Sequence, residues 1–307
     1  MIPAEYADTI TMDARDSGEL PDTINALALG PGGICFAARN SGLFRSGDGG
    51  QSWRLAYASL NLDAPLATTA LALSPNVARD QTLLAGANGG VLRSADGGAT
   101  WQITMLPEPA PLVTRLALSP NFAADRLAFA GTLEDGMFRS HDGGATWAAW
   151  NFGLLDPSVL ALAISPDFAR DQTLYAGADS GLFRSSNTGR SWREVELPAG
   201  FTAVLSIAAA GGQLWVGTED AGLLSTADAG RSWRQIELGG PVGELVALGA
   251  SELLALAGDR ALLSRDAGAT WAELHAGVVA LAAASGEPLL AGMADGSVRQ
   301  LVDSKGL

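Results

Sequence analysis

Short apolar runs, separated by glycine and polar turns, recur along almost the whole chain. One such run starts with glycine or alanine and leads into a polar turn, at 42–45, 90–93, 136–139, 181–184, 222–224, 261–263 and 296–299. A run ending in Ala-Gly or Val-Gly usually precedes it, and a run of small and branched apolar residues comes earlier still, as at 71–73, 116–118 and 162–164. Runs this short, bounded by turn residues roughly every 8–12 positions, predict an all-β fold.

Each of the first six repeats contains a turn that closes on a tryptophan. It reads Ser or Thr, any residue, Asp or Asn, any residue, Gly, any residue, Ser or Thr, and Trp, and the tryptophans follow at steps of 48, 46, 45, 41 and 38 residues. The third and last positions are Asp48 and Trp53, Asp96 and Trp101, Asp142 and Trp147, Asn187 and Trp192, Asp228 and Trp233, and Asp266 and Trp271. The tryptophan begins a fourth strand, and four strands in a period of this length are typical of a propeller blade.

We therefore predict a single domain over residues 1–307, a seven-bladed β-propeller of four-stranded antiparallel blades. The blades are expected at about 22–57, 67–105, 113–151, 159–197, 202–237, 243–275 and 277–302. The seventh repeat stops after its third strand, near Leu301. The segment 7–12 has a strand-like composition, so residues 1–15 are predicted to supply a closing strand that pairs with the last blade and removes an open sheet edge.

The repeated turn is interpreted as structural. A carboxylate accepts several backbone N–H groups in a tight turn, and glycine adopts backbone angles that other residues resist. The tryptophan that follows buries a large ring in the blade. In the fourth copy, Asn187 keeps a hydrogen-bond acceptor and loses the charge.

The six turns resemble the Asp-box, or BNR, repeats of sialidases, sortilin-type receptors, xyloglucan-degrading enzymes and photosystem II assembly factors. The likeness extends from about Asn25 to Arg299, and the segments SPNVARDQTLLAGANGGVLRS, SPNFAADRLAFAGTLEDGMFRS and SPDFARDQTLYAGADSGLFRS resemble bacterial members without an assigned activity. The resemblance implies that the turns lie on an inert side and that ligands bind the opposite face. It implies no particular reaction, because unrelated functions share the repeat.

On that opposite face, the turns between second and third strands offer an acidic axial rim. Its residues are Glu134, Asp135, Asp179, Glu219, Asp220 and Asp295. A rim of this kind suits a cation or a basic peptide. The alternative is that these residues serve the geometry of tight hairpins.

The longer loops between the early blades carry aromatic side chains, among them Tyr57, Trp150 and Phe152. Exposed aromatic side chains often anchor protein interfaces. The alternative is that these loops fold back over the blades as small apolar clusters.

Charge and composition narrow the choice of partner. The chain has 33 acidic against 19 basic residues, a net charge of −14, so nucleic acid is not expected as a partner. No apolar run reaches the roughly 18 residues of a membrane span, and neither a signal peptide nor an internal disulfide is expected, since Cys35 is the sole cysteine. These features favour a soluble cytoplasmic protein with a protein partner, basic or polar. Acidity that serves only solubility is the alternative.

Catalytic chemistry finds little support in the residue inventory. The two histidines, His141 and His275, cannot form a histidine metal cage, and neither a sialidase FRIP segment nor a phosphate-binding glycine loop is found. We expect no cofactor and no metal, and favour a non-enzymatic scaffold that binds proteins through the face opposite the tryptophan turns. The alternative is a BNR-type glycoside hydrolase or carbohydrate-binding protein acting in the axial funnel, where the acidic rim would supply the carboxylate pair.

Overall fold

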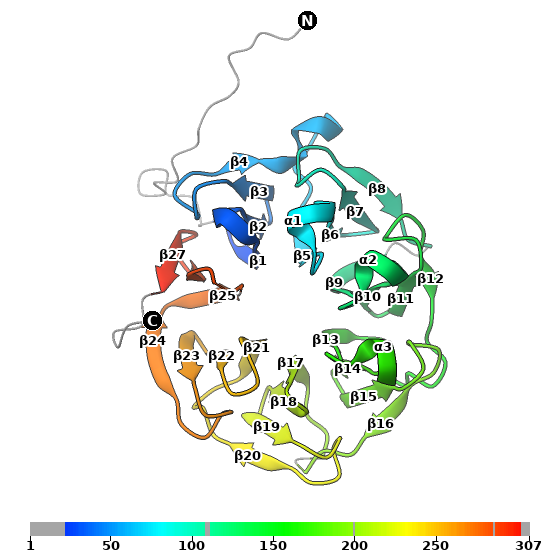
Figure 1. The fold of residues 1–307 in the computed structure, drawn as a ribbon, viewed down its shortest axis with the longest axis vertical. Coiled ribbons are helices and arrows are strands. Elements are labelled where there is room, and N and C mark those ends of the chain that lie inside the picture. Colours follow the sequence, from blue (N-terminus) through cyan, green and yellow to red (C-terminus); the bar gives the residue numbers. More distant parts are fainter. Residues whose placement is uncertain (1–21, 108–110, 199, 285, 302–307) are drawn as a thin grey trace, which may run out of the picture.

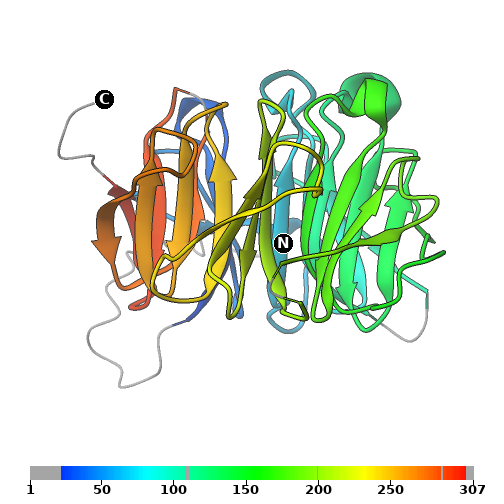
Figure 2. The ribbon, with the colours of Figure 1, turned by 90° about the horizontal axis from the view of Figure 1, so that it is seen from below.

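Seven β-sheets surround a central axis in the computed structural model, which describes residues 22–107, 111–198, 200–284 and 286–301 (Figure 1). In six sheets, four antiparallel strands follow one another in chain order from the axis to the perimeter, and three such strands form the seventh within the described residues. The sheets stand side by side and together form a disc (Figure 2). The chain is therefore a seven-bladed β-propeller, which confirms the fold predicted from the repeat.

The strands nearest the axis are β1 (Ile24–Leu29), β5 (Thr68–Leu73), β9 (Leu112–Leu118), β13 (Val159–Ile164), β17 (Val204–Ala210), β21 (Val242–Ala247) and β25 (Val278–Ala282). The second strands are β2 (Cys35–Arg39), β6 (Leu83–Ala87), β10 (Ala128–Leu133), β14 (Leu174–Ala178), β18 (Gln213–Thr218), β22 (Leu253–Ala257) and β26 (Leu289–Met293). The third strands are β3 (Gly42–Ser46), β7 (Gly90–Ser94), β11 (Gly136–Ser140), β15 (Gly181–Ser185), β19 (Leu223–Thr226), β23 (Arg260–Ser264) and β27 (Val298–Leu301). The outermost strands are β4 (Arg54–Leu55), β8 (Gln102–Met105), β12 (Ala148–Ala149), β16 (Arg193–Val195), β20 (Arg234–Ile236) and β24 (Ala272–Ala276). The loops contain α1 (Val77–Asp80), α2 (Phe122–Asp125), α3 (Phe168–Asp171), and the 3-10 helices η1 (Pro31–Gly33) and η2 (Ala56–Leu60).

The core lies between neighbouring blades rather than at one centre. Second strands such as β6 and β14 are buried along their whole length, because adjacent sheets cover both of their faces. Glycine stands where two blades approach most closely: a Cβ at Gly86 would lie 2.6 Å from Cγ1 of Val113, and one at Gly131 2.5 Å from Cγ1 of Val159. The repeated small residues thus set the spacing of the blades near the axis.

Hydrogen bonds from the innermost strands join consecutive blades. The register of each innermost strand shifts near its start. In the first three blades the bulged residue reaches the next blade. Asn25 Nδ2 donates to the carbonyl of Thr68 at 2.9 Å, Thr69 Oγ1 to that of Val113 at 2.5 Å, and Thr114 Oγ1 to that of Val159 at 2.5 Å. We call these contacts inter-blade links.

The six tryptophan turns, called aspartate turns below, are held by hydrogen bonds to the side chain at their third position, which is aspartate in five copies and Asn187 in the fourth. In the second copy, Asp96 accepts hydrogen bonds from the hydroxyls of Ser94 at 2.8 Å and Thr100 at 2.5 Å. The backbone N–H groups of Ala99 and Thr100 donate to the same carboxylate, at 3.0 and 2.9 Å. In the fourth copy, Asn187 Nδ2 instead donates to the hydroxyl of Ser191 at 2.8 Å, so the turn survives without a charge.

These hydrogen bonds favour the ionised carboxylate. They lower the pKa of Asp266 to about 2, chiefly through Thr270. At Asp96 and Asp142 partial burial opposes ionisation, but the donors outweigh it and the pKa is again about 2. A group whose pKa is lower folded than unfolded stabilises the protein above the unfolded value, which is about 3.9 for aspartate, and loses that contribution as the pH falls through the folded value.

We expect the variant Asp266→Asn to weaken the acid sensitivity of the fold. Its free energy of unfolding should lie below that of the wild type near pH 6, and the difference should shrink between about pH 4 and pH 2, because one differential proton uptake is removed. Urea denaturation across this pH range measures the effect. The reciprocal variant Asn187→Asp should steepen the same pH dependence. An Asp266→Asn deficit that is as large at pH 2.5 as at pH 6 would contradict this account of the turns.

The first and last blades contact each other directly. Arg39 is 1 % exposed, and its guanidinium donates to the carbonyl of Asp22 at 2.9 Å and to that of Gly296, in the seventh blade, at 2.7 Å. Leu29 and Cys35 of the first blade share an apolar cluster with side chains of β25 and β26. The predicted closing strand, within residues 1–15, lies outside the described residues. Among the described helices, none has the length and apolar character that a membrane crossing requires.

Candidate functional site

The two faces of the disc differ in what their loops offer. One face carries the six aspartate turns and α1 to α3, which lie between first and second strands. The opposite face, called the inter-blade face below, carries the loops that lead from the outer strand of one blade to the inner strand of the next. It also carries the hairpin turns between second and third strands. This alternation follows from antiparallel strands that run in chain order from the axis outwards.

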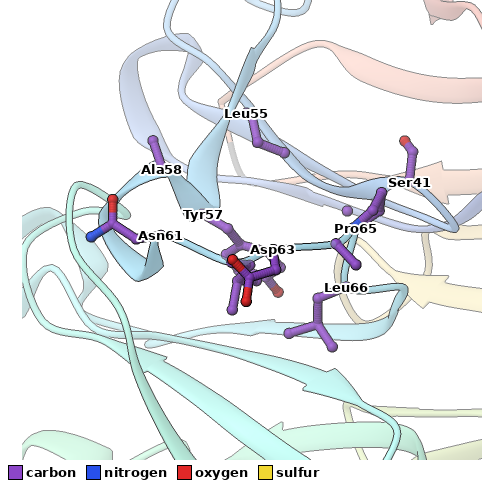
Figure 3. Close-up of a pocket in the computed structure, with 11 residues that line it drawn as sticks. Ser41, Leu55, Tyr57, Ala58, Asn61, Asp63, Pro65 and Leu66 are labelled. Atoms are coloured by element: carbon purple, nitrogen blue, oxygen red, sulfur yellow. The ribbon is translucent and has the colours of Figure 1, made fainter. Parts of the chain in front are cut away.

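A pocket of about 290 Å³ opens on the inter-blade face between the first two blades (Figure 3). The hairpin between β2 and β3 supplies one wall and the loop after β4 supplies the other. Its lining is mainly apolar, with Leu55 47 % and Leu62 41 % exposed. The full lining is Ser41, Gly42, Leu55, Tyr57, Ala58, Asn61, Leu62, Asp63, Ala64, Pro65 and Leu66.

The sequence of the loop explains its shape. The 3-10 helix η2 ends at Leu60 and is capped by Asn61, whose φ of 48° is left-handed, a conformation that asparagine tolerates better than most residues. Its N–H donates back to the carbonyl of Ala58. Asp63 follows and places an exposed carboxylate beside the apolar lining. The pocket therefore suits an apolar side chain with a polar or basic neighbour.

Tyr57 supports this loop from below, contrary to the expectation that it contributes to a contact surface. It is 3 % exposed, its hydroxyl lies 2.9 Å from Oγ1 of Thr68, and its ring meets Trp101 edge-on with 5.6 Å between centroids. Burial raises the pKa of its phenol. An aromatic residue followed by Ala-Ser-Leu reads equally well as a loop anchor, so the sequence alone could not separate the two roles.

Exposed apolar side chains continue along the inter-blade face. Met105, Leu155 and Phe201 are 64 %, 76 % and 86 % exposed. Met105 is the last residue of β8, and Leu155 and Phe201 belong to the connections after β12 and β16, so they follow the pocket in three successive blade junctions. A series of neighbouring exposed apolar side chains marks an interaction surface more often than a single isolated one does.

Trp150 and Phe152 follow the outermost strand β12 and lie at the perimeter of the disc, called the outer wall below, between the third and fourth blades. The carbonyl of Trp150 accepts from Nε1 of Trp192 at 2.9 Å, and that of Phe152 from the backbone N–H of Trp192 at 2.9 Å. The segment is thereby bound to the fourth aspartate turn. Phe152 is 80 % exposed, whereas Trp150 is half-buried against Arg139, whose guanidinium carbon lies 4.6 Å from the indole centroid.

The acidic side chains of the expected rim are mostly exposed and spread over several blades. Glu134, Asp179, Glu219, Asp220 and Asp295 are exposed and Asp135 is half-buried. Asp295 accepts from the backbone and hydroxyl of Ser297 and pairs with Arg299 at 3.3 Å, which lowers its pKa. Within the described residues, no three acidic, histidine or cysteine side chains converge as a metal site would require.

Two charged residues near the axis were missed by sequence reasoning. Both stand at the first position after the bulge of their inner strand, Arg115 in the third blade and Glu244 in the sixth. The other five blades have a small residue at this position: Ala26, Ala70, Ala161, Ser206 and Ala280. These two blades lie across the axis from each other (Figure 1). Aligning the inner strands by their bulges would have revealed the exception.

Arg115 and Glu244 are both half-buried and carry opposite charges. Glu244 accepts a hydrogen bond of 2.6 Å from the backbone N–H of Leu281 in β25. Burial raises the pKa of Glu244 to about 7, although that hydrogen bond and the charge of Arg115 both favour its ionised form. Burial likewise lowers the pKa of Arg115, and the Glu244 carboxylate partly offsets the shift. Arg115 and Glu244 thus place one guanidinium and one carboxyl with a raised pKa on strands beside the axis.

Comparison with known proteins agrees with a propeller built from repeats. A family model described as the DUF6242 beta propeller domain matches residues 172–284. No curated protein matches the chain.

Several solved structures share the architecture across almost the whole chain. YCF48 bound to D1 peptide is 17 % identical over 93 % of this chain and 95 % of its own length, with a TM-score of 0.71. An ancestral GH74 enzyme is 15 % identical over 94 % of this chain and 46 % of its own, at 0.72. The extracellular domain of a putative one component system from B. thetaiotaomicron is 16 % identical over 96 % of this chain, at 0.71, and the chain spans only 39 % of its length. At these identities the likeness shows the fold alone.

Proposed function

We propose that this propeller is a non-enzymatic scaffold that binds a protein partner through the inter-blade face of its first four blades. The observation that carries the proposal is the pocket beside Leu55 and Leu62, continued by the exposed apolar side chains at the next three blade junctions. Apolar anchors in a shallow cleft, surrounded by polar residues, are the usual core of a peptide-binding surface. A solved propeller of the same size holds a peptide, which is a precedent for the fold.

The charge of the chain indicates which partners this face would prefer. Asp63 stands beside the pocket, and Glu134 and Asp179 stand on hairpins of the third and fourth blades. With a net charge of −14, the protein would attract basic segments and repel acidic ones. The proposed partner segment is therefore extended, with an apolar residue next to lysine or arginine, and the proposed compartment is the cytoplasm.

Affinity capture from native cells tests the surface. The double variant Leu62→Gln, Leu155→Gln should retain its fold and lose at least about tenfold of the captured partner, since anchor residues typically contribute 2 kcal/mol or more, about 30-fold. The matched control is Ile103→Gln, because Ile103 is 41 % exposed but lies on β8 at the perimeter. A photo-crosslinking amino acid at position 62 would identify the bound segment. Equal capture by the double variant and the wild type would refute the assignment.

Glycoside hydrolysis is the second candidate. It is favoured by the likeness in fold to GH74 propellers and by Glu244, whose pKa of about 7 suits a general acid. Such catalysis needs a second, ionised carboxylate at a defined separation, and the charged neighbour of Glu244 is Arg115. A screen of diverse oligosaccharides tests this candidate. Turnover that is abolished by Glu244→Gln, Glu134→Gln or Asp179→Asn would replace the scaffold proposal.

A further inference from the structure

The repeated arginine of the third strands has a fixed role in the first two blades. Arg45 Nε donates to the carbonyl of Gly97 at 3.0 Å, and Arg93 Nε to that of Gly143 at 3.0 Å. Each arginine thus binds the aspartate turn of the following blade. In the third and fourth blades the equivalent residues are Arg139 and Arg184, and the Nε of each is buried without a hydrogen-bond partner among the described residues.

Around Arg139, an aromatic contact comes from the segment that follows β12. It brings the indole of Trp150 against the guanidinium of Arg139, with 4.6 Å from its carbon to the ring centroid. The same segment is bound to the fourth aspartate turn through Trp192. At the next junction, the carbonyl of Glu196 accepts from Nε1 of Trp233 in the same way. The third junction therefore has an aromatic residue where the fourth has a carboxylate.

A second arginine converges on the same place. Arg190, in the fourth aspartate turn, is exposed, and after burial its positive charge is the main reason that the pKa of Arg139 falls, while Asp125 opposes the shift. Neither Arg139 nor Arg190 lies within ion-pair distance of a carboxylate in the described part of the chain. Both arginines line the same pocket without an ion-paired carboxylate, although the chain has 33 acidic residues.

A cavity of about 460 Å³ lies between these residues on the outer wall. Besides the two arginines, its walls include His141, Thr146, Trp147 and Trp150. Guanidinium groups bind tetrahedral oxyanions through several charge-assisted hydrogen bonds, and indole rings supply flat apolar walls. We propose that this pocket between the third and fourth blades binds a phosphate or sulfate group, carried as an ester on a flat apolar ring.

Isothermal titration calorimetry in a low-salt, phosphate-free buffer tests the site with three probes: inorganic phosphate, phenyl phosphate and phenol. Phenyl phosphate should bind saturably, with a Kd below about 1 mM, and more tightly than phenol. If phenyl phosphate binds more tightly than inorganic phosphate, the ligand is assigned as the ester. If the two bind equally, the ligand is assigned as the free oxyanion. Both results support the anion site. Phenol that binds as tightly as phenyl phosphate, or no saturable binding of either anion, would overturn the proposal.

The repeat supplies a matched pair of variants. Arg190→Gln should raise the Kd for phenyl phosphate at least about tenfold, because it removes a charge-assisted contact. Arg231→Gln removes the arginine at the same position of the fifth turn and should leave the Kd unchanged. An equal loss in both variants would show an effect of net charge alone and overturn the site. The double variant Leu62→Gln, Leu155→Gln should bind phenyl phosphate normally, so this pocket is tested independently of the protein-binding face.

Discussion

Replacing Trp215 with alanine is expected to lower the free energy of unfolding by about 3–5 kcal/mol, the range for removing a buried large aromatic ring. Trp215 lies on β18 of the fifth blade, is 0 % exposed and is the largest fully buried side chain among the described residues. Its Nε1 donates to the carbonyl of Ala267, in the aspartate turn of the sixth blade, at 3.2 Å. The substitution therefore opens a cavity between two blades and leaves that carbonyl without its donor.

Two further variants separate these contributions. Trp215→Phe keeps most of the ring volume and should cost less, with a hydrogen-bond component of about 0.5–1.5 kcal/mol. Trp233→Ala is the matched control, because Trp233 is only half-buried and its Nε1 bonds to Glu196. Urea denaturation followed by circular dichroism measures all three. Equal destabilisation by Trp215→Ala and Trp233→Ala would contradict a core located between the blades.

The variant Gly217→Ala is expected to destabilise the fold by about 1–3 kcal/mol or more, as overpacking does in a well-packed core. A Cβ at this position would lie 2.5 Å from the carbonyl oxygen of Val242 and would overlap Oγ of Ser206. Those two atoms form a 2.7 Å hydrogen bond that joins the fifth and sixth blades. Backbone cannot move away as a flexible side chain would, so the blades themselves must separate.

Gly243→Ala is the control for this prediction. Gly243 occupies the bulge of β21, its φ lies outside the left-handed region, and a Cβ there would meet nothing within 4 Å. Its substitution should leave stability within about 0.5 kcal/mol of the wild type or raise it slightly, because alanine restricts the unfolded chain. Thermal unfolding of both variants provides the measurement. A midpoint for Gly217→Ala equal to that of Gly243→Ala would refute the close approach of the blades.

The repeat allowed the architecture to be predicted because similar residues recur at equivalent positions of each blade and pack in the same way. The turn from Ser94 to Trp101 has a local cause, since the hydrogen bonds of its Asp96 carboxylate and Ser94 hydroxyl join residues at most four positions apart. The apolar pocket could be anticipated only as a long loop, because its lining combines the hairpin at Ser41 with residues twenty positions later. Whether Tyr57 points into the core or to solvent depends on Thr68 and Trp101, which local pattern does not reveal.

The site residues outside the repeat pattern were harder to anticipate for a different reason. Arg115 and Glu244 are 129 positions apart in the sequence, and only the ring arrangement of the blades lets their charges interact. Arg139 stands at the same position of the repeat as Arg45 and Arg93, whose side chains bind the aspartate turn of the next blade. Its distinct role depends on Trp150, one residue beyond β12, whose position is set by the following blade. Departures from the repeat, more than the repeat itself, carried the functional information.

The inter-blade links are unevenly distributed, and this has a consequence for how the ring would be taken apart. On the inner strands, the residues whose side chains form hydrogen bonds to the next blade are Asn25, Thr69, Thr114, Ser206 and Glu244. Across the closure, Arg39 of β2 binds the seventh blade. In the described part of the chain, the inner strand of the fourth blade makes no such bond: its bulge is Leu160, and the hydroxyl of Thr202 nearby is buried without a partner. The seam between the fourth and fifth sheets is held by apolar contacts alone near the axis, so it is the natural place to divide the molecule into two complementing fragments or to introduce new chain ends by circular permutation.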